Sequence, residues 1–66
     1  MRIFLNGEAR EVENGLVLSA LIDSLDLPGD GVAVALNRQV VPRAQWPERV
    51  LSEGDRVEIV RAVGGG

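Results

Sequence analysis

The sequence of 66 residues contains no cysteine, no histidine and no lysine. These three side chains supply most of the thiol nucleophiles, metal ligands and Schiff-base amines found in proteins. Their absence excludes a zinc site, a Cys-His or Ser-His catalytic pair and a phosphate-binding loop lysine. Without cysteine the chain has no disulfide framework and no redox motif, which fits an intracellular domain.

Aromatic residues are also scarce, with one Phe, one Trp and no Tyr, although 45% of the residues are hydrophobic. The core must therefore be built from Val, Leu, Ile and Ala. This much apolar material exceeds what a disordered chain carries. The length corresponds to one small domain, too small to enclose a ligand-sized pocket, so we expect any chemistry at its surface or at one end.

Long apolar runs and a basic charge balance are missing as well. No run approaches the roughly 20 apolar residues that span a bilayer, and the first residues turn polar too early for a secretory signal. We therefore expect a cytoplasmic protein with no membrane partner. The net charge of −3 argues against nucleic-acid binding, which needs a basic face.

The first thirteen residues predict a β-hairpin. Residues 2–6 alternate, with Ile3 and Leu5 on one face and Phe4 on the other, and end at Asn6-Gly7. This dipeptide is favoured in two-residue hairpin turns. The strand that follows covers residues 8–13.

Residues 16–25 change to a helical period, with apolar side chains on one side of an expected helix of about three turns. Leu27-Pro28-Gly29 would end it. Asn14 is the only good N-cap candidate, because Leu16 stands where a capping Ser or Thr is expected.

The second half predicts three more strands, at residues 31–37, 39–41 and 56–63. Asn37 and Arg38 form a turn, and Pro42 and Pro47 bracket a segment that can hold only a turn or a single helical loop. The order β, β, α, β, β, β indicates an α+β fold. It fits best a ubiquitin-like β-grasp domain over residues 1–63, a mixed sheet of about five strands with one helix on one face.

Three glycines, Gly64, Gly65 and Gly66, follow the last strand at residues 64–66. A terminal carboxylate on glycine has no side chain beside it, and three extended residues reach about 10 Å. Such a flexible tail can enter a narrow channel in a partner enzyme. If the domain carries sulfur, this carboxylate is the only candidate, since there is no cysteine. The alternative is a frayed end without function.

The chain resembles the ThiS sulfur carriers of thiamin thiazole biosynthesis, which are ubiquitin-like β-grasp proteins. The resemblance covers essentially the whole chain, and its most specific parts are Ala35-Leu36-Asn37, Val41-Pro42-Arg43 with Trp46, Leu51 through Gly54-Asp55-Arg56-Val57-Glu58-Ile59-Val60, and the Gly65-Gly66 end. Leu16 departs from the family, which usually has a helix-capping Thr there.

The resemblance implies a carrier without catalytic residues or a cofactor of its own. An E1-like, ThiF-like adenylyltransferase would use ATP to adenylate the Gly66 carboxylate, which would become a thiocarboxylate. A donor such as a cysteine desulfurase would supply the sulfur, and a ThiG-like thiazole synthase would accept it. We expect a monomer when no partner is bound.

The sheet face away from the helix is the expected docking surface. Since Val57 and Ile59 face inward, the partner-binding candidates on the outer face are Phe4, Glu58, Val60 and Ala62. Phe4 joins them if the first and last strands are neighbours, and Phe4 and Val60 would then form an exposed apolar patch. The alternative is scattered surface apolar residues.

Two other features have structural interpretations. Trp46 should pack over one end of the core with its indole N–H bonded to a carbonyl, and Glu53 and Asp55 should stabilise a turn.

Three other functions share these features. The MoaD-like small subunit of molybdopterin synthase uses the same chemistry, although such chains are longer and have an aromatic, Pro-rich approach to the glycines. A ubiquitin-like modifier would form amide bonds to lysines of other proteins. An interaction module would leave its tail unused.

Overall fold

The computed structural model describes residues 1–27 and 31–61. Its elements follow the predicted order, and the expected helical loop between the last two strands is a short 3-10 helix. They are β1 (Arg2–Leu5), β2 (Glu8–Glu11), α1 (Leu18–Ser24), β3 (Val32–Leu36), β4 (Gln39–Val40), the 3-10 helix η1 (Arg43–Glu48) and β5 (Arg56–Arg61). The predicted residues 62 and 63 of the last strand lie outside the described residues, as do Pro28 and Gly29 and the glycines at 64–66.

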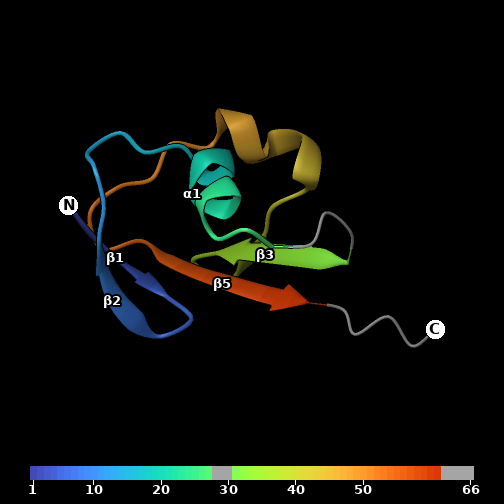
Figure 1. Cartoon of the computed structure of the whole chain (residues 1–66), viewed down its shortest axis with the longest axis horizontal. Coiled ribbons are helices and arrows are strands. Elements are labelled where there is room, and N and C mark those ends of the chain that lie inside the picture. The colour runs from blue at the N-terminus through green and yellow to red at the C-terminus, as the bar shows by residue number, and fades with distance from the viewer. Residues whose placement is uncertain (28–30, 62–66) are drawn as a thin grey trace.

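The five strands form one mixed sheet in the order β2-β1-β5-β3-β4. β1 and β5 run parallel, while the other neighbouring pairs are antiparallel. Both helices lie on one side of this sheet (Figure 1). The two-layer α+β fold with neighbouring first and last strands is confirmed. Because β5 is the central strand, it is hydrogen-bonded on both edges.

Two hairpin turns have the backbone that the sequence predicts. Asn6 and Gly7 have φ values of 49° and 85°, and Asn37 and Arg38 have values of 50° and 71°. Positive φ at both central residues is the signature of the type I′ turn, whose twist matches that of paired strands. Gly7 tolerates this conformation readily, whereas Arg38 occupies it at a steric cost.

Helix α1 is shorter than expected, with seven residues in place of about three turns. Its N-cap is Val17, which is extended and offers no side-chain cap, so the prediction that Asn14 caps the helix is wrong. Val17 instead forms an isolated β-bridge with Val50, and the Leu18 N–H donates to the Arg49 carbonyl at 2.8 Å. This pairing keeps the chain extended to Val17 and delays the first helical turn.

The segment around Trp46 is the expected single helical loop, although Pro47 lies inside η1 and does not end it. Trp46 is 6% exposed, and its indole Nε1–H donates to the Val41 carbonyl at 2.8 Å. The predicted packing of Trp46 and its hydrogen bond to a carbonyl are both confirmed. The indole thereby anchors η1 to the end of β4.

The core lies between the sheet and the helices and is made almost entirely of aliphatic side chains. Its buried members are Ile3, Leu18, Leu21, Ile22, Val34, Leu36, Val41, Trp46, Leu51 and Val57. Neither helix in the described part of the chain has the length and apolarity to cross a bilayer.

Candidate functional site

Strand β5 is the element that leads to the glycine tail, and two asparagine side chains fix it, one at its start and one in its middle. Near its start, Asn37 Oδ1 accepts the Arg56 N–H at 2.9 Å, while Asn37 Nδ2 donates to Asp55 Oδ1 at 3.1 Å. Further along, Asn6 Oδ1 accepts the Ile59 N–H at 2.8 Å. Both asparagines open type I′ turns, so the hairpin turns themselves hold β5 in register.

The predicted interpretation of Glu53 and Asp55 as turn residues is confirmed. Asp55 Oδ2 accepts the Ser52 N–H at 2.8 Å, and Glu53 Oε1 accepts the Arg2 N–H at 3.1 Å. The Asp55 carboxylate thus closes the turn before β5, while the Glu53 carboxylate joins that turn to the start of β1. Among the described residues, no group of three or more acidic side chains is arranged to hold a metal ion.

The outer face of the sheet carries the predicted partner-binding residues that the structure describes. Phe4 is half-buried, Glu58 is exposed and Val60 is 63% exposed. Ala62 and the tail glycines Gly64, Gly65 and Gly66 lie outside the described residues. Contact between any of these residues and a partner stays a prediction.

Phe4 and Val60 share this face but are not neighbours. In the parallel β1–β5 ladder Phe4 lies beside Arg56, and Val60 comes four residues later, about 13 Å along the strand. Val60 lies instead beside Ala33 of β3. The expected apolar patch is therefore divided, with Arg56 and Glu58 between its two parts.

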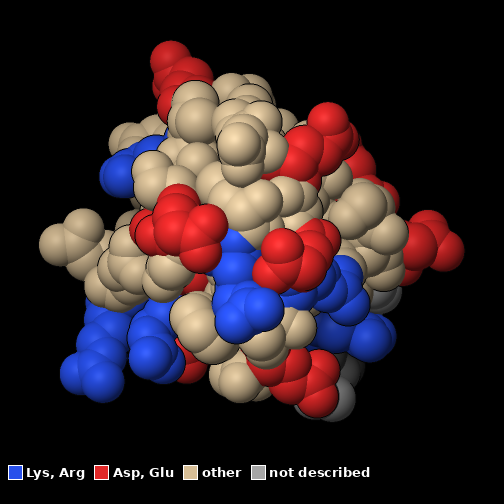
Figure 2. All heavy atoms as spheres, turned by 90° about the vertical axis from the view of Figure 1, so that its left-hand side faces the viewer, with Lys and Arg blue, Asp and Glu red and all other residues tan. Residues whose placement is uncertain are grey.

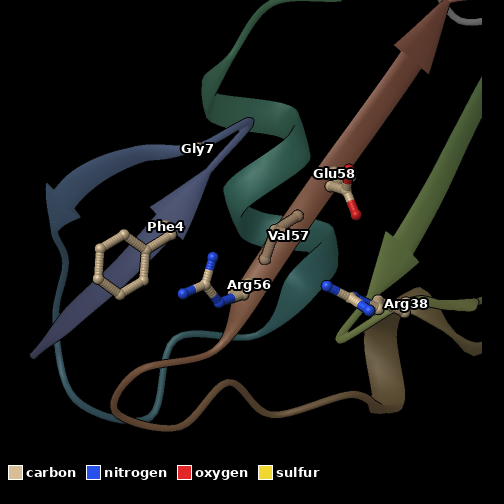
Figure 3. A pocket seen from close by; sticks show the side chains of 6 residues that line it. All are labelled: Phe4, Gly7, Arg38, Arg56, Val57 and Glu58. Carbon is tan, nitrogen blue, oxygen red and sulfur yellow. The ribbon is translucent and has the colours of Figure 1, made fainter.

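A hollow of about 200 Å³ lies on the Phe4 side of this divided patch, lined by Phe4, Gly7, Arg38, Arg56, Val57 and Glu58. It brings together two of the predicted residues, Phe4 and Glu58. The Arg56 guanidinium lies over the Phe4 ring, 5.2 Å from its centroid, and Arg38 reaches towards β5 from the opposite side (Figure 3). The hollow thus combines two cations, one carboxylate and an aromatic ring.

Sequence reasoning missed both arginines of the hollow. The alternation that placed Glu58 and Val60 outward also places Arg56 on the same face, so that signal was present. Arg38 carries no such signal, because its position beside β5 follows from the pairing of β3 with both β4 and β5.

Positive and negative side chains are interspersed on the molecular face seen in Figure 2, with most of the visible arginines over the sheet layer. No single sign of charge covers that view. This face therefore produces only a weak long-range field, because opposite charges a few ångströms apart cancel at longer range.

A second, more apolar groove of about 310 Å³ lies on the helix side of the sheet, between the end of α1 and β5. It is lined by Leu5, Asn6, Leu25, Leu27, Ile59 and Arg61. Arg61 is the last described residue of β5, so this groove borders the point where the chain continues towards the glycines. Neither hollow contains a nucleophile and base within reach of each other, as acyl or phosphoryl transfer by the chain itself would need.

Comparison with known proteins gives one consistent result. The model of the ThiS family matches residues 3–66. The sulfur carrier protein ThiS of Escherichia coli is 33% identical over 66 residues, and the match covers 100% of both chains. A thiazole synthase of Magnetococcus marinus is 41% identical over all 66 residues, which span 20% of that longer protein.

The fold agrees with these matches. The crystal structure of the thiamine biosynthesis protein ThiS of Geobacter metallireducens superposes with a TM-score of 0.85 over 100% of both chains, at 29% sequence identity. The chain therefore has the β-grasp arrangement that the sequence predicts.

Proposed function

The chain belongs to the ThiS family, and from this premise we propose that it carries sulfur as a thiocarboxylate on Gly66. It is a sulfur carrier of thiamin thiazole biosynthesis and not a catalyst. The observation that supports the Gly66 assignment most strongly is the match to a sulfur carrier over 100% of both chains, which aligns the two ends.

The chemistry needs activation, because a carboxylate is a poor electrophile at neutral pH. An E1-like, ThiF-like enzyme binds ATP, and the Gly66 carboxylate attacks the α-phosphate and displaces pyrophosphate. The terminal sulfur of a persulfide on a donor such as a cysteine desulfurase then attacks the acyl carbon, and AMP leaves. A thiol reduces the resulting acyl disulfide and releases the thiocarboxylate. Because the partner enzyme binds the ATP, the carrier needs no cofactor of its own. We place the reaction in the cytoplasm, where ATP is present.

The structure of the described residues supports this role through β5. The strand is paired on both edges and fixed by Asn6 and Asn37. The element that precedes the tail in the sequence is therefore rigidly supported. A glycine tail on such a support can reach into an enzyme while the domain docks outside. Gly64 and Gly65 provide the narrow approach, and Gly66 provides the reacting carboxyl group.

Thiazole synthase is the proposed acceptor of the sulfur. Proteins with that name contain a segment similar to this whole chain, which supports cooperation between the two kinds of domain. The outer sheet face, with Phe4, Glu58, Val60 and Ala62, is the proposed docking surface for the partner enzymes, since the opposite face is filled by the helices.

Alkylation followed by mass spectrometry tests the proposal. The purified chain is incubated with host lysate, ATP and a sulfur source, then treated with a thiol-alkylating reagent. Because the chain has no cysteine, ATP-dependent alkylation localised to Gly66 is expected only from a thiocarboxylate. A variant lacking Gly65 and Gly66 is the control and should stay unmodified.

Two results would contradict it. Alkylation that does not depend on ATP, or that lies elsewhere in the chain, would refute the assignment of the sulfur to Gly66. Recovery of the chain attached to lysines of lysate proteins, without alkylation, would favour a protein modifier.

A further inference from the structure

We propose that Arg38 and Arg56 form a binding site for a carboxylate side chain of thiazole synthase, in the hollow on the outer sheet face. This inference rests on the proposed function, because it assigns the contact to the enzyme that accepts the sulfur. It adds a specific cationic anchor to a docking surface for which the sequence had predicted Phe4, Glu58, Val60 and Ala62.

The first observation that supports the site is the charge of the residues that line the hollow. Within the described residues, no carboxylate forms an ion pair with Arg38 or Arg56. Both side chains are exposed and line the same hollow, with Glu58 as its single acid. The hollow is thus locally positive, although the chain has a net charge of −3. A locally positive site favours an incoming anion.

Arg56 is also held in place. The Arg56 backbone is bonded on both sides to Asn37, with its N–H donating to Asn37 Oδ1 and its carbonyl accepting the Asn37 N–H at 2.8 Å. Its guanidinium stacks over Phe4 at 5.2 Å. A pre-positioned guanidinium loses less side-chain freedom on binding, and its fork matches a carboxylate in a bidentate geometry.

The backbone conformation at Arg38 is the third observation that supports the site. It occupies the second position of a type I′ turn at φ 71°, where glycine is strongly preferred. Gly7 holds the corresponding position of the other hairpin turn. Strained positions occur preferentially at functional sites, and here the strain places a guanidinium at the edge of the hollow.

The size of the hollow decides the kind of occupant. A volume of about 200 Å³ is smaller than the roughly 300 to 1,000 Å³ of sites that enclose drug-sized ligands. It suits a single acidic side chain that projects from a protein surface. Arginine is enriched among the residues that contribute most to protein interfaces.

Calorimetric titration of the purified chain with thiazole synthase from the same organism tests the site. The central variant is Arg38→Gly, which removes the guanidinium while relieving the turn, so its thermal stability should equal or exceed that of the parent. We expect its affinity to fall by about tenfold or more. Arg56→Gln should cause a similar loss, and Arg56→Lys a smaller one, because lysine keeps the charge but loses the fork.

Arg49→Gln is the matched control, since Arg49 is an exposed arginine in the helix layer, bonded through its carbonyl to Leu18. It should leave affinity within about twofold of the parent. Raising the salt concentration should weaken the parent more than an Arg38→Gly, Arg56→Gln double variant.

The outcomes separate the two proposals. If the parent binds thiazole synthase and the Arg38 and Arg56 variants bind equally well, the carboxylate site is refuted while the carrier function stands. If the parent does not bind at all, both the assigned acceptor and this site are refuted. The alkylation of Gly66 would remain an independent result.

Discussion

Trp46 shows how much one residue contributes to this small fold. We expect Trp46→Phe to lower the free energy of unfolding by about 1–3 kcal/mol, because the Val41 carbonyl loses the indole donor at 2.8 Å in a buried position. Equilibrium urea unfolding followed by far-ultraviolet circular dichroism measures the change without relying on the lost tryptophan fluorescence.

Val50→Ala serves as the comparison, because Val50 is 60% exposed and lies nearby in the chain. Its effect should stay within about 0.5 kcal/mol. A Trp46→Phe variant as stable as the parent would mean that the indole hydrogen bond contributes nothing to holding η1.

Single residues differ in how far the sequence predicts their surroundings. The partner of the Trp46 indole and the turn role of Asp55 follow from local chemistry, since a buried donor needs an acceptor and a turn favours Asp. The pairing of Arg56 with Phe4 depends on which strands become neighbours. Such contacts are visible in the sequence only after the sheet order is assumed.

At the scale of elements, Asn37 joins a turn to the central strand, and its two functions can be separated by substitution. Asn37→Gly keeps the positive φ but removes the bonds to Arg56 and Asp55, with an expected loss of about 1–2 kcal/mol. Asn37→Ala should cost about 1 kcal/mol more, because alanine must also adopt the left-handed conformation. Urea unfolding of the two variants gives the difference.

Asn14→Ala provides the matched asparagine control. Asn14 is exposed, makes no hydrogen bond within the described residues and does not cap α1. Its removal should change stability by less than about 0.5 kcal/mol. Equal effects of Asn37→Gly and Asn14→Ala would show that the Asn37 side chain does not hold β5.

The sequence predicts the buried face of helix α1 but not where the helix begins and ends. The apolar spacing correctly predicted a helix with one buried face, which Leu18, Leu21 and Ile22 form. It could not reveal that Leu16 and Val17 pair with residues 50 and 51, with Leu51 N–H donating to the Leu16 carbonyl at 2.8 Å. That pairing spans more than thirty residues, and it outweighs local helix propensity. At the other end, Asp26 adopts φ 53° and the helix stops before Leu27.

At the scale of the whole molecule, the sheet order explains why a domain this small can support a carrier function. The central strand β5 is paired with β1 and β3 and continues towards the tail, so the most constrained element precedes the proposed reactive end. One sheet face is filled by the helices, which leaves the other face for partners. The sequence predicted this division of faces through alternation, but the two-arginine hollow arises only from the assembled sheet.

The whole fold depends on a thin aliphatic core, and Leu21→Ala tests that dependence. Leu21 is 2% exposed, and truncating a buried leucine costs about 2–5 kcal/mol. A domain of 66 residues has a total stability of roughly 3–10 kcal/mol, so the variant should unfold at much lower urea and populate unfolded chains without denaturant. Amide NMR spectra measure the folded fraction directly.

Val40→Ala, at a side chain 76% exposed, should leave the spectrum and the urea midpoint unchanged. If Leu21→Ala kept the parent's midpoint, α1 would not be part of the cooperative unit. If it unfolds as expected, thiocarboxylate formation at Gly66 should fall with the folded fraction, because a partner can dock only on an assembled sheet.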